Sequence, residues 1–191
     1  MALAILQART SSSRLPGKVL RPLLGRAMIL RELDRLKECR EITQLVLATS
    51  TDPTDDELAQ TVEAAGYDVY RGSLDDVLGR YYHCAQRYMP THVVRLTGDC
   101  PVIDPHIVDR VTVQHAAERN DYTSTTERFP DGLDTEIMTY AALEKAYQKA
   151  DLPSEREHVT LYIRRHPELF RVGTVDCAED YGAMRWTVDE P

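Results

Sequence analysis

Short apolar runs alternate with longer amphipathic stretches along the first 120 residues of the chain. Each run has a length typical of a buried strand and is bounded by polar or turn-forming residues. The expected strands cover residues 2–6, 44–49, 67–70 and 92–96. Between them, apolar residues recur at helical spacing, as Ile29, Leu33 and Leu36 do. Strands that alternate with helices predict crossover connections and a mainly parallel sheet.

Capping patterns mark several of the expected helix starts. Thr54 and Glu57 have the spacing of a capping box. Asp104 and Pro105 have the pattern of an N-cap followed by the first helical residue. The helices that these patterns predict cover about residues 26–38, 54–66, 73–88 and 105–118.

The regular alternation breaks after Asp121. Strand-like segments follow at residues 122–126, 135–139, 170–175 and 184–188, and helices are expected at 141–150 and 154–165. The last two strand-like segments are expected to close the sheet. We interpret residues 1–191 as one α/β domain in which residues 121–175 form an insertion into the α/β layer.

Charge is distributed unevenly along the chain. The net charge is −8, but residues 1–40 contain nine Lys or Arg against three Asp or Glu. A generally acidic protein is a poor candidate for nucleic-acid binding. A basic N-terminal segment on that background instead indicates a local anionic ligand.

The composition is that of a soluble globular protein, with 42% hydrophobic and 28% charged residues. No apolar run approaches the length of about 18 residues that a membrane span needs. The N-terminus enters a strand directly, without the charged region of a signal peptide. Four cysteines lack C-x-x-C spacing and predict reduced thiols. These features predict a cytoplasmic protein that does not bind a membrane.

The loop after the first strand is rich in hydroxyl groups and cations. Arg9, Arg14 and Lys18 lie within ten residues, and four consecutive Thr or Ser residues lie among them. Small polar residues let backbone N–H groups point into a loop, so this combination suits a polyphosphate. Neither G-x-x-x-x-G-K-[ST] nor G-x-G-x-x-G is present in the sequence. The alternative interpretation is a solvated basic surface loop.

Two aspartates each follow an expected strand. Asp99 lies just beyond the fourth strand, and Asp189 ends the segment 185–188 in the same way. Ligands bind beyond the carboxyl ends of strands in open α/β sheets. Either residue alone is typical of a turn or a cap. Together they are a carboxylate pair of the kind that binds Mg²⁺ with phosphate oxygens.

Several of these segments resemble one protein family. Gln7-Ala8-Arg9 and Ser13–Leu20 resemble the opening of the spore coat polysaccharide biosynthesis cytidylyltransferases, which are related to the acylneuraminate and ketodeoxyoctonate cytidylyltransferases. Arg95–Pro101 and Arg185–Asp189 are similar to later motifs of that family. The resemblance covers nearly the whole chain. It implies a three-layer Rossmann-like nucleotide-diphospho-sugar transferase fold with a small inserted α+β lobe.

The resemblance also implies CTP-dependent cytidylyl transfer, in which an acceptor oxygen attacks the α-phosphorus of CTP and pyrophosphate leaves. Arg9, Lys18 and Asp99 would act in catalysis, and Asp99 and Asp189 would hold Mg²⁺. The implied nucleotide-binding residues are Gln7, Ala8, Arg9, Ser13, Arg14, Lys18, Arg80 and Thr97.

The acceptor is implied to be an acidic sugar or a similar small acid of cell-surface polysaccharide synthesis. Residues 121–175 would bind it and could form a homodimer contact. Arg156 is the best candidate for an anionic acceptor, because a guanidinium binds a carboxylate through two hydrogen bonds. The alternatives are a capping box formed by Ser154 and Glu157 and a buried core position for His158. The full expected acceptor set is Asp134, Glu136, Arg156, Glu157 and His158.

Two other functions remain open at the level of sequence. A glycosyltransferase using a nucleotide-sugar would keep the fold, although Asp99 lacks the partner of an Asp-x-Asp pair. A non-catalytic nucleotide-binding subunit is the other alternative. It is suggested by the chain end at Pro191, two residues after the last motif aspartate, where family members usually continue.

Overall fold

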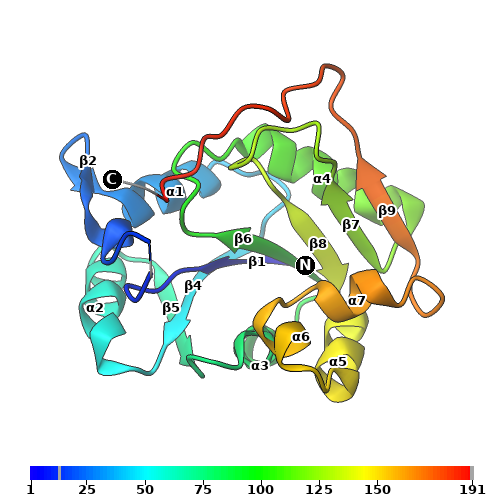
Figure 1. The fold of residues 1–191 in the computed structure, drawn as a ribbon, viewed down its shortest axis with the longest axis horizontal. Coiled ribbons are helices and arrows are strands. Elements are labelled where there is room, and N and C mark those ends of the chain that lie inside the picture. The colour runs from blue at the N-terminus through cyan, green and yellow to red at the C-terminus, as the bar shows by residue number, and fades with distance from the viewer. Residues whose placement is uncertain (13, 190–191) are drawn as a thin grey trace.

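A seven-stranded sheet forms the centre of the computed structural model, which describes residues 1–12 and 14–189. Its strand order is β5-β4-β1-β6-β8-β7-β9 (Figure 1). The strands are β1 (Ala2–Gln7), β4 (Gln44–Ser50), β5 (Asp68–Gly72), β6 (His92–Thr97), β7 (Tyr122–Thr125), β8 (Glu136–Thr139) and β9 (Val172–Val175). A separate short hairpin joins β2 (Pro22–Leu23) to β3 (Arg26–Ala27).

Four neighbouring strands, β5, β4, β1 and β6, run parallel. Gln7 lies beside Ala48 on one side and Thr97 on the other, so these strands deliver their carboxyl ends to one edge of the sheet. Strand β8 is antiparallel to both β6 and β7, and β9 is parallel to β7. The expected mainly parallel sheet is therefore confirmed.

Helices cover both faces of the sheet. The buried residues of α1, α2 and α4 pack against one face, and those of α3, α5 and α7 pack against the other. Alternate residues of β1 explain the two layers, since Ile5 joins one core and Leu6 the other. The helices are α1 (Met28–Leu36), α2 (Asp56–Ala64), α3 (Val77–Tyr88), α4 (Pro105–Glu118), α5 (Tyr140–Lys149), α6 (Pro153–Glu157) and α7 (Leu161–Arg165). The expected three-layer α/β fold is confirmed.

Some helix starts agree with the sequence patterns and others differ. Asp104 caps α4 by accepting a hydrogen bond from the His106 N–H at 2.9 Å, as expected. The expected capping box at Thr54 is wrong. Asp52 instead caps the short 3₁₀ turn Pro53–Asp55 by accepting from the Thr54 N–H at 2.9 Å. Proline at the first position of that turn favours this earlier start.

The helix expected at residues 154–165 is broken into α6 and α7. The capping box that Ser154 and Glu157 offered as an alternative does not form, because α6 begins at Pro153 and has no side-chain cap. Val159 and Thr160 lie between the two helices and are buried. The Thr160 hydroxyl donates to Glu136 at 2.7 Å, so this contact with the sheet replaces a continuous helix.

Residues 184–188 do not form the expected strand. Only an isolated bridge joins Arg185 to Asp131. The segment runs along the loops at one edge of the sheet and returns toward the N-terminal loop (Figure 1). Its backbone is bonded to these loops, with the Val188 N–H donating to the Asp99 carbonyl at 2.9 Å. These loop contacts, and not a strand, therefore place Asp189.

Residues 121–175 contribute β7, β8 and β9 to the central sheet and α5, α6 and α7 to one of its faces. Their role as an acceptor-binding or dimerisation lobe stays a prediction. The four cysteines form no disulfide. Among the described residues, no helix combines the length and the apolar character needed to cross a membrane.

Candidate active site

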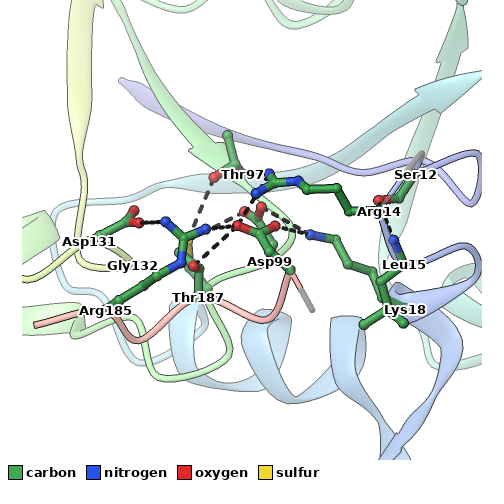
Figure 2. A network of polar contacts seen from close by, with 12 residues as sticks. Ser12, Arg14, Leu15, Lys18, Thr97, Asp99, Asp131, Gly132, Arg185 and Thr187 are labelled. Atoms are coloured by element: carbon green, nitrogen blue, oxygen red, sulfur yellow. Dashed lines mark hydrogen bonds and ion pairs between the residues drawn. The ribbon is translucent and has the colours of Figure 1, made fainter. Parts of the chain in front are cut away.

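Lys18 lies at the centre of the candidate site. It begins a 3₁₀ turn directly after Gly17, whose φ of 69° is in the left-handed region that favours glycine. The lysine side chain is buried, and its Nζ lies 2.6 Å from Asp189 Oδ1 and 3.1 Å from Asp99 Oδ2. A buried ammonium needs such partners. Figure 2 shows Arg14, Lys18 and Arg185 converging beside Asp99.

The carboxylates of Asp99 and Asp189 therefore converge although ninety positions separate them. Asp189 also forms ion pairs with Arg14, at 3.3 Å, and with Arg185. Burial alone would raise the pKa of Asp189. The hydrogen bond and charge of Lys18, together with the charges of Arg14 and Arg185, hold that pKa below its usual value. Asp189 is thus an anion at neutral pH.

A glycine makes room for this arrangement beyond β6. A Cβ atom at Gly98 would lie 2.7 Å from the Ala8 Cβ and 2.8 Å from the Ile29 Cδ1. The Gly98 N–H donates to the Gln7 carbonyl at 2.7 Å. A larger residue at position 98 would therefore push the segment that carries Asp99 away from the N-terminal loop.

These residues line a cavity of about 240 Å³, called here the small cavity. Most of the expected nucleotide-binding residues take part in it. The predicted residues found in its wall are Gln7, Ala8, Arg9, Arg14, Lys18, Thr97, Asp99 and Asp189. Ser13 lies outside the described residues. Arg9 is exposed and makes no ion pair with any described residue, so its charge is free for a ligand.

Arg80 lies apart from the small cavity's wall. Its side chain is fully buried, and its guanidinium donates to the Ser73 carbonyl at 2.6 Å. Burial lowers the pKa of Arg80. This contact fixes the loop before α3, and a role in nucleotide binding stays a prediction.

A second cavity of about 1020 Å³, called here the large cavity, opens between β6, β7, β8, β9 and α7. Three expected acceptor residues, Asp134, Glu136 and His158, line it. Arg95 and Arg164 line it as well, and the sequence did not single them out. Both cavities use β6, since Arg95 lines the large cavity and Thr97 the small one.

Glu136 forms the floor of the large cavity and is fully engaged there. It accepts hydrogen bonds from Arg95, from the Tyr122 hydroxyl and from the Thr160 hydroxyl. Burial would raise the pKa of Glu136, but the charge of Arg95 and these hydrogen bonds lower it. Arg164, in contrast, is exposed at the cavity and forms no ion pair with any described residue.

Arg156 and Glu157, the other expected acceptor residues, line neither cavity. Arg156 pairs with Asp76, donates to the Tyr147 carbonyl at 2.8 Å and stacks 4.8 Å above the Tyr147 ring. Its partners are thus residues of α5 and of the N-terminal end of α3. The expected acceptor role of Arg156 stays a prediction, and its contacts indicate a structural one.

The donor set at Lys18 fits a divalent cation that takes further ligands from a substrate. Asp99 and Asp189 supply two convergent carboxylates. Within the described residues, no cluster of three or more His, Cys, Asp or Glu side chains has a metal-binding arrangement. Mg²⁺ commonly uses one or two protein carboxylates together with phosphate oxygens and water. The pair suits that pattern, and Lys18 lies between its members.

One carboxyl group near this site was missed by the sequence analysis. Glu32 on α1 is completely buried, and both of its oxygens lack a hydrogen-bond partner among the side chains and backbone that the structure describes. Burial, and then the charge of Asp99, raises the pKa of Glu32 well above its usual value, which favours the protonated form. Burial also raises the pKa of Cys100, which keeps that thiol protonated. The Cys100 thiol therefore adds no negative charge to the small cavity.

Comparisons with known proteins agree on one family. A family model described as cytidylyltransferase matches residues 3–188. The spore coat polysaccharide biosynthesis protein SpsF of Bacillus subtilis is 37% identical, over 98% of this chain and 80% of SpsF. The structure of a cytidylyltransferase from Leptospira borgpetersenii superposes with a TM-score of 0.94 at 33% identity, covering 98% of this chain and 81% of that one. CMP:2-keto-3-deoxy-manno-octonic acid synthetase complexed with CTP shares the fold, with a TM-score of 0.78 at 19% identity and coverage of 100% and 93%.

Proposed function

The chain belongs to the cytidylyltransferase family, and on that premise we propose that it transfers CMP from CTP to a small acidic sugar-like acceptor, with release of pyrophosphate. Membership confirms the resemblance found in the N-terminal loop and in the segments around Asp99 and Asp189. The observation that carries the proposal is the pair of cavities that share strand β6. One cavity is rich in cations beside two carboxylates, and the other is large enough for a sugar.

The small cavity would hold the nucleotide. Arg9, Arg14 and Lys18 would neutralise the triphosphate, and Gln7, Ala8 and Thr97 would contact the remainder of CTP. Phosphoryl and nucleotidyl transfer depend mainly on positioning and charge neutralisation. Cations in this number are therefore sufficient for the chemistry without a covalent nucleophile. Ser13 and Arg80 belong to the proposed nucleotide site through the family resemblance alone.

Asp99 and Asp189 would hold Mg²⁺, which supplies charge neutralisation at the phosphate oxygens. Without the nucleotide, Lys18 satisfies both carboxylates. When the triphosphate enters, its negative charge gives Lys18 an alternative partner, and the two carboxylates become available. Nucleotide and metal binding are therefore expected to support each other.

The large cavity would hold the acceptor. Arg95 and Glu136 neutralise each other at its floor, so neither charge is free for a ligand. Arg164 is exposed there without an ion pair among the described residues, and a guanidinium binds a carboxylate through two hydrogen bonds. We therefore add Arg164 to Asp134, Glu136 and His158 as a proposed acceptor residue. In the reaction, an acceptor hydroxyl oxygen forms a bond to the α-phosphorus, the bond to pyrophosphate breaks, and the hydroxyl proton is released.

A pyrophosphate-release assay tests the proposal. The chain is incubated with Mg²⁺, with CTP, UTP, ATP or GTP, and with a panel of acidic sugars matched to neutral sugars of the same ring size. We expect release only with CTP and only with acidic acceptors. Equal release with neutral sugars would remove the acidic acceptor from the proposal. CTP binding without turnover on the whole panel would favour a non-catalytic subunit, and turnover of a nucleotide-sugar would favour a glycosyltransferase.

A further inference from the structure

A buried carboxylate, Asp55, lies outside the small cavity and contacts the loop that forms it. Asp55 ends the 3₁₀ turn before α2, and its side chain has no exposed surface. Burying a charge is costly unless hydrogen bonds satisfy it. Its Oδ1 accepts from the Thr10 N–H at 2.7 Å and lies 2.8 Å from the Thr10 hydroxyl, whose single proton it shares with the Thr54 carbonyl, also at 2.8 Å. Its Oδ2 accepts from the Ser50 N–H at 3.2 Å and from the Ser50 hydroxyl.

Thr10 connects Asp55 to two other residues of the loop, Ser12 and Gly17. The Thr10 carbonyl accepts from the Ser12 N–H and from the Gly17 N–H, each at 2.9 Å. Gly17 immediately precedes Lys18, which bridges the two proposed metal ligands. Asp55 therefore holds the residue whose carbonyl closes the loop just before Lys18.

Because Asp55 is charged and buried, its hydrogen-bond donors, including those of Thr10, must stay in place. Asp55 forms no ion pair with any described residue, so the direct partners of its charge are hydrogen-bond donors. Burial would raise the pKa of Asp55, but the hydrogen bonds from Ser50 and Thr10 lower it, and the group is ionised at neutral pH. If Thr10 moved away, half of these donors would be lost and a buried charge would be left partly unsatisfied. The loop is thus tied to the end of β4.

We propose that Asp55 is a positioning residue that holds residues 8–12 and 14–18 in the conformation that receives the triphosphate before CTP binds. This inference rests on the proposed function, because the ligand of the loop is taken to be CTP. Asp55 acts through Thr10 and does not touch the ligand. A loop that is already ordered loses less conformational entropy when it binds, and this raises affinity for CTP without any additional contact.

Asp55→Asn tests this role. The asparagine amide has one acceptor oxygen and one NH₂ group. The NH₂ group would face the donors of either Thr10 or Ser50, so the connection to one of these two residues is lost. We expect the Kd for CTP, measured by titration calorimetry, to rise by about tenfold or more. The KM for the acceptor should remain unchanged. Asp52→Asn is the matched control, because Asp52 belongs to the same turn but bonds Thr54 and not Thr10.

Thr10 provides a second test that keeps the buried carboxylate. Thr10→Val removes the hydroxyl donor while preserving the side-chain shape and the backbone N–H, and Thr10→Ser keeps the hydroxyl. We expect weaker CTP binding in Thr10→Val and recovery of most of the affinity in Thr10→Ser. If Asp55→Asn fails to fold, this pair decides the question alone.

The outcomes separate this inference from the proposed function. Absence of CTP binding by the unmodified chain would overturn both. Normal CTP binding by the unmodified chain, with an unchanged Kd in Asp55→Asn or in Thr10→Val, would overturn only the role of Asp55. A lower kcat with unchanged Kd for CTP would also overturn it, because that pattern indicates a smaller folded fraction.

Discussion

The two cavities differ in how their charges are arranged. In the small cavity, two carboxylates share one buried lysine, and Arg9 has no ion pair with any described residue. In the large cavity, Glu136 and Arg95 form a pair, and Glu136 accepts two further hydrogen bonds from the Tyr122 and Thr160 hydroxyls. Arg164 also lines this cavity and has no ion pair with any described residue. In the small cavity, a charged ligand can therefore replace one partner of an existing ion pair. In the large cavity, the Glu136–Arg95 pair stays in place, so selectivity for a ligand depends on the shape of the cavity and on the Arg164 guanidinium.

This difference separates variants that change chemistry from variants that change stability. Substituting one residue of an ion pair in the small cavity leaves its partner charged, and the ligand or water can satisfy that charge. Removing one partner of a buried pair leaves an uncompensated charge and costs roughly 3–5 kcal/mol.

The proposed metal ligands should give the largest effect. Asp99→Asn and Asp189→Asn should each lower turnover by about 10²-fold or more, because charge neutralisation at the phosphates is lost. Nucleotide-dependent Mg²⁺ binding, measured by calorimetry, should be lost as well. Asp189→Asn should also lower the Tm, since Asp189 pairs with Lys18, Arg14 and Arg185.

Asp131→Asn is the matched control for these two variants. Asp131 pairs with Arg185 at 2.6 Å but does not line the small cavity. Its metal binding and turnover should equal those of the unmodified chain. Full turnover in Asp99→Asn would contradict the metal site, and an equal loss in Asp131→Asn would show that the effect does not depend on the carboxylate pair.

Lys18→Met should change two affinities in opposite directions. Without the ammonium, Asp99 and Asp189 face each other and repel, so a divalent cation alone should bind more tightly than to the unmodified chain. CTP should bind about tenfold more weakly, because one cation of the triphosphate site is missing. Both affinities can be measured by calorimetry. Lys37→Met, on an exposed lysine, should change neither, and unchanged metal affinity in Lys18→Met would contradict the shared carboxylates.

In the large cavity, Arg164→Ala should raise the acceptor KM by about tenfold and leave the Kd for CTP unchanged. The neighbouring Arg165 offers a contrast on the same helix. It pairs with the buried Glu155 at 3.4 Å and does not line the cavity. Arg165→Ala should therefore lower the Tm without raising the acceptor KM. Steady-state kinetics and thermal melts of the two variants decide the assignment, and an unchanged KM in Arg164→Ala would remove Arg164 from the acceptor site.

The small cavity could be predicted from the sequence because most of its wall is contiguous. Residues 7–18 bring cations and hydroxyls together regardless of the rest of the fold. The approach of Asp189 to Asp99 was expected for a reason that proved wrong. We expected parallel strands to place both residues, whereas backbone bonds between loops place Asp189. Sequence periodicity does not detect such contacts.

The large cavity could be predicted only in part because its residues come from β6, β7, β8, β9 and α7. Arg95 lies between the apolar residues Val94 and Leu96, and Arg164 is one of two adjacent arginines. Only the fold distinguishes the arginine that faces the cavity from the one that pairs with Glu155. The same limit applies at Asp55, whose acidic side chain looked like part of a helix start but reaches Thr10, 45 residues away.

Arg156 should give the smallest effect on activity, although its sequence context favoured an acceptor role. Its guanidinium joins Asp76, the N-cap of α3, to the Tyr147 carbonyl and ring. These contacts are partly exposed, so their loss should cost about 1 kcal/mol. For a chain of this size, that is a fall in Tm of roughly 2–4 °C.

Arg156→Ala should keep both substrate affinities, and Arg156→Lys should lose the stacking and one hydrogen bond and show an intermediate Tm. Asp76→Ala should lower the Tm by more, because Asp76 also accepts from the Gly79 N–H at 2.8 Å. A raised acceptor KM in Arg156→Ala with an unchanged melting curve would instead return Arg156 to the acceptor site and extend that site beyond the large cavity.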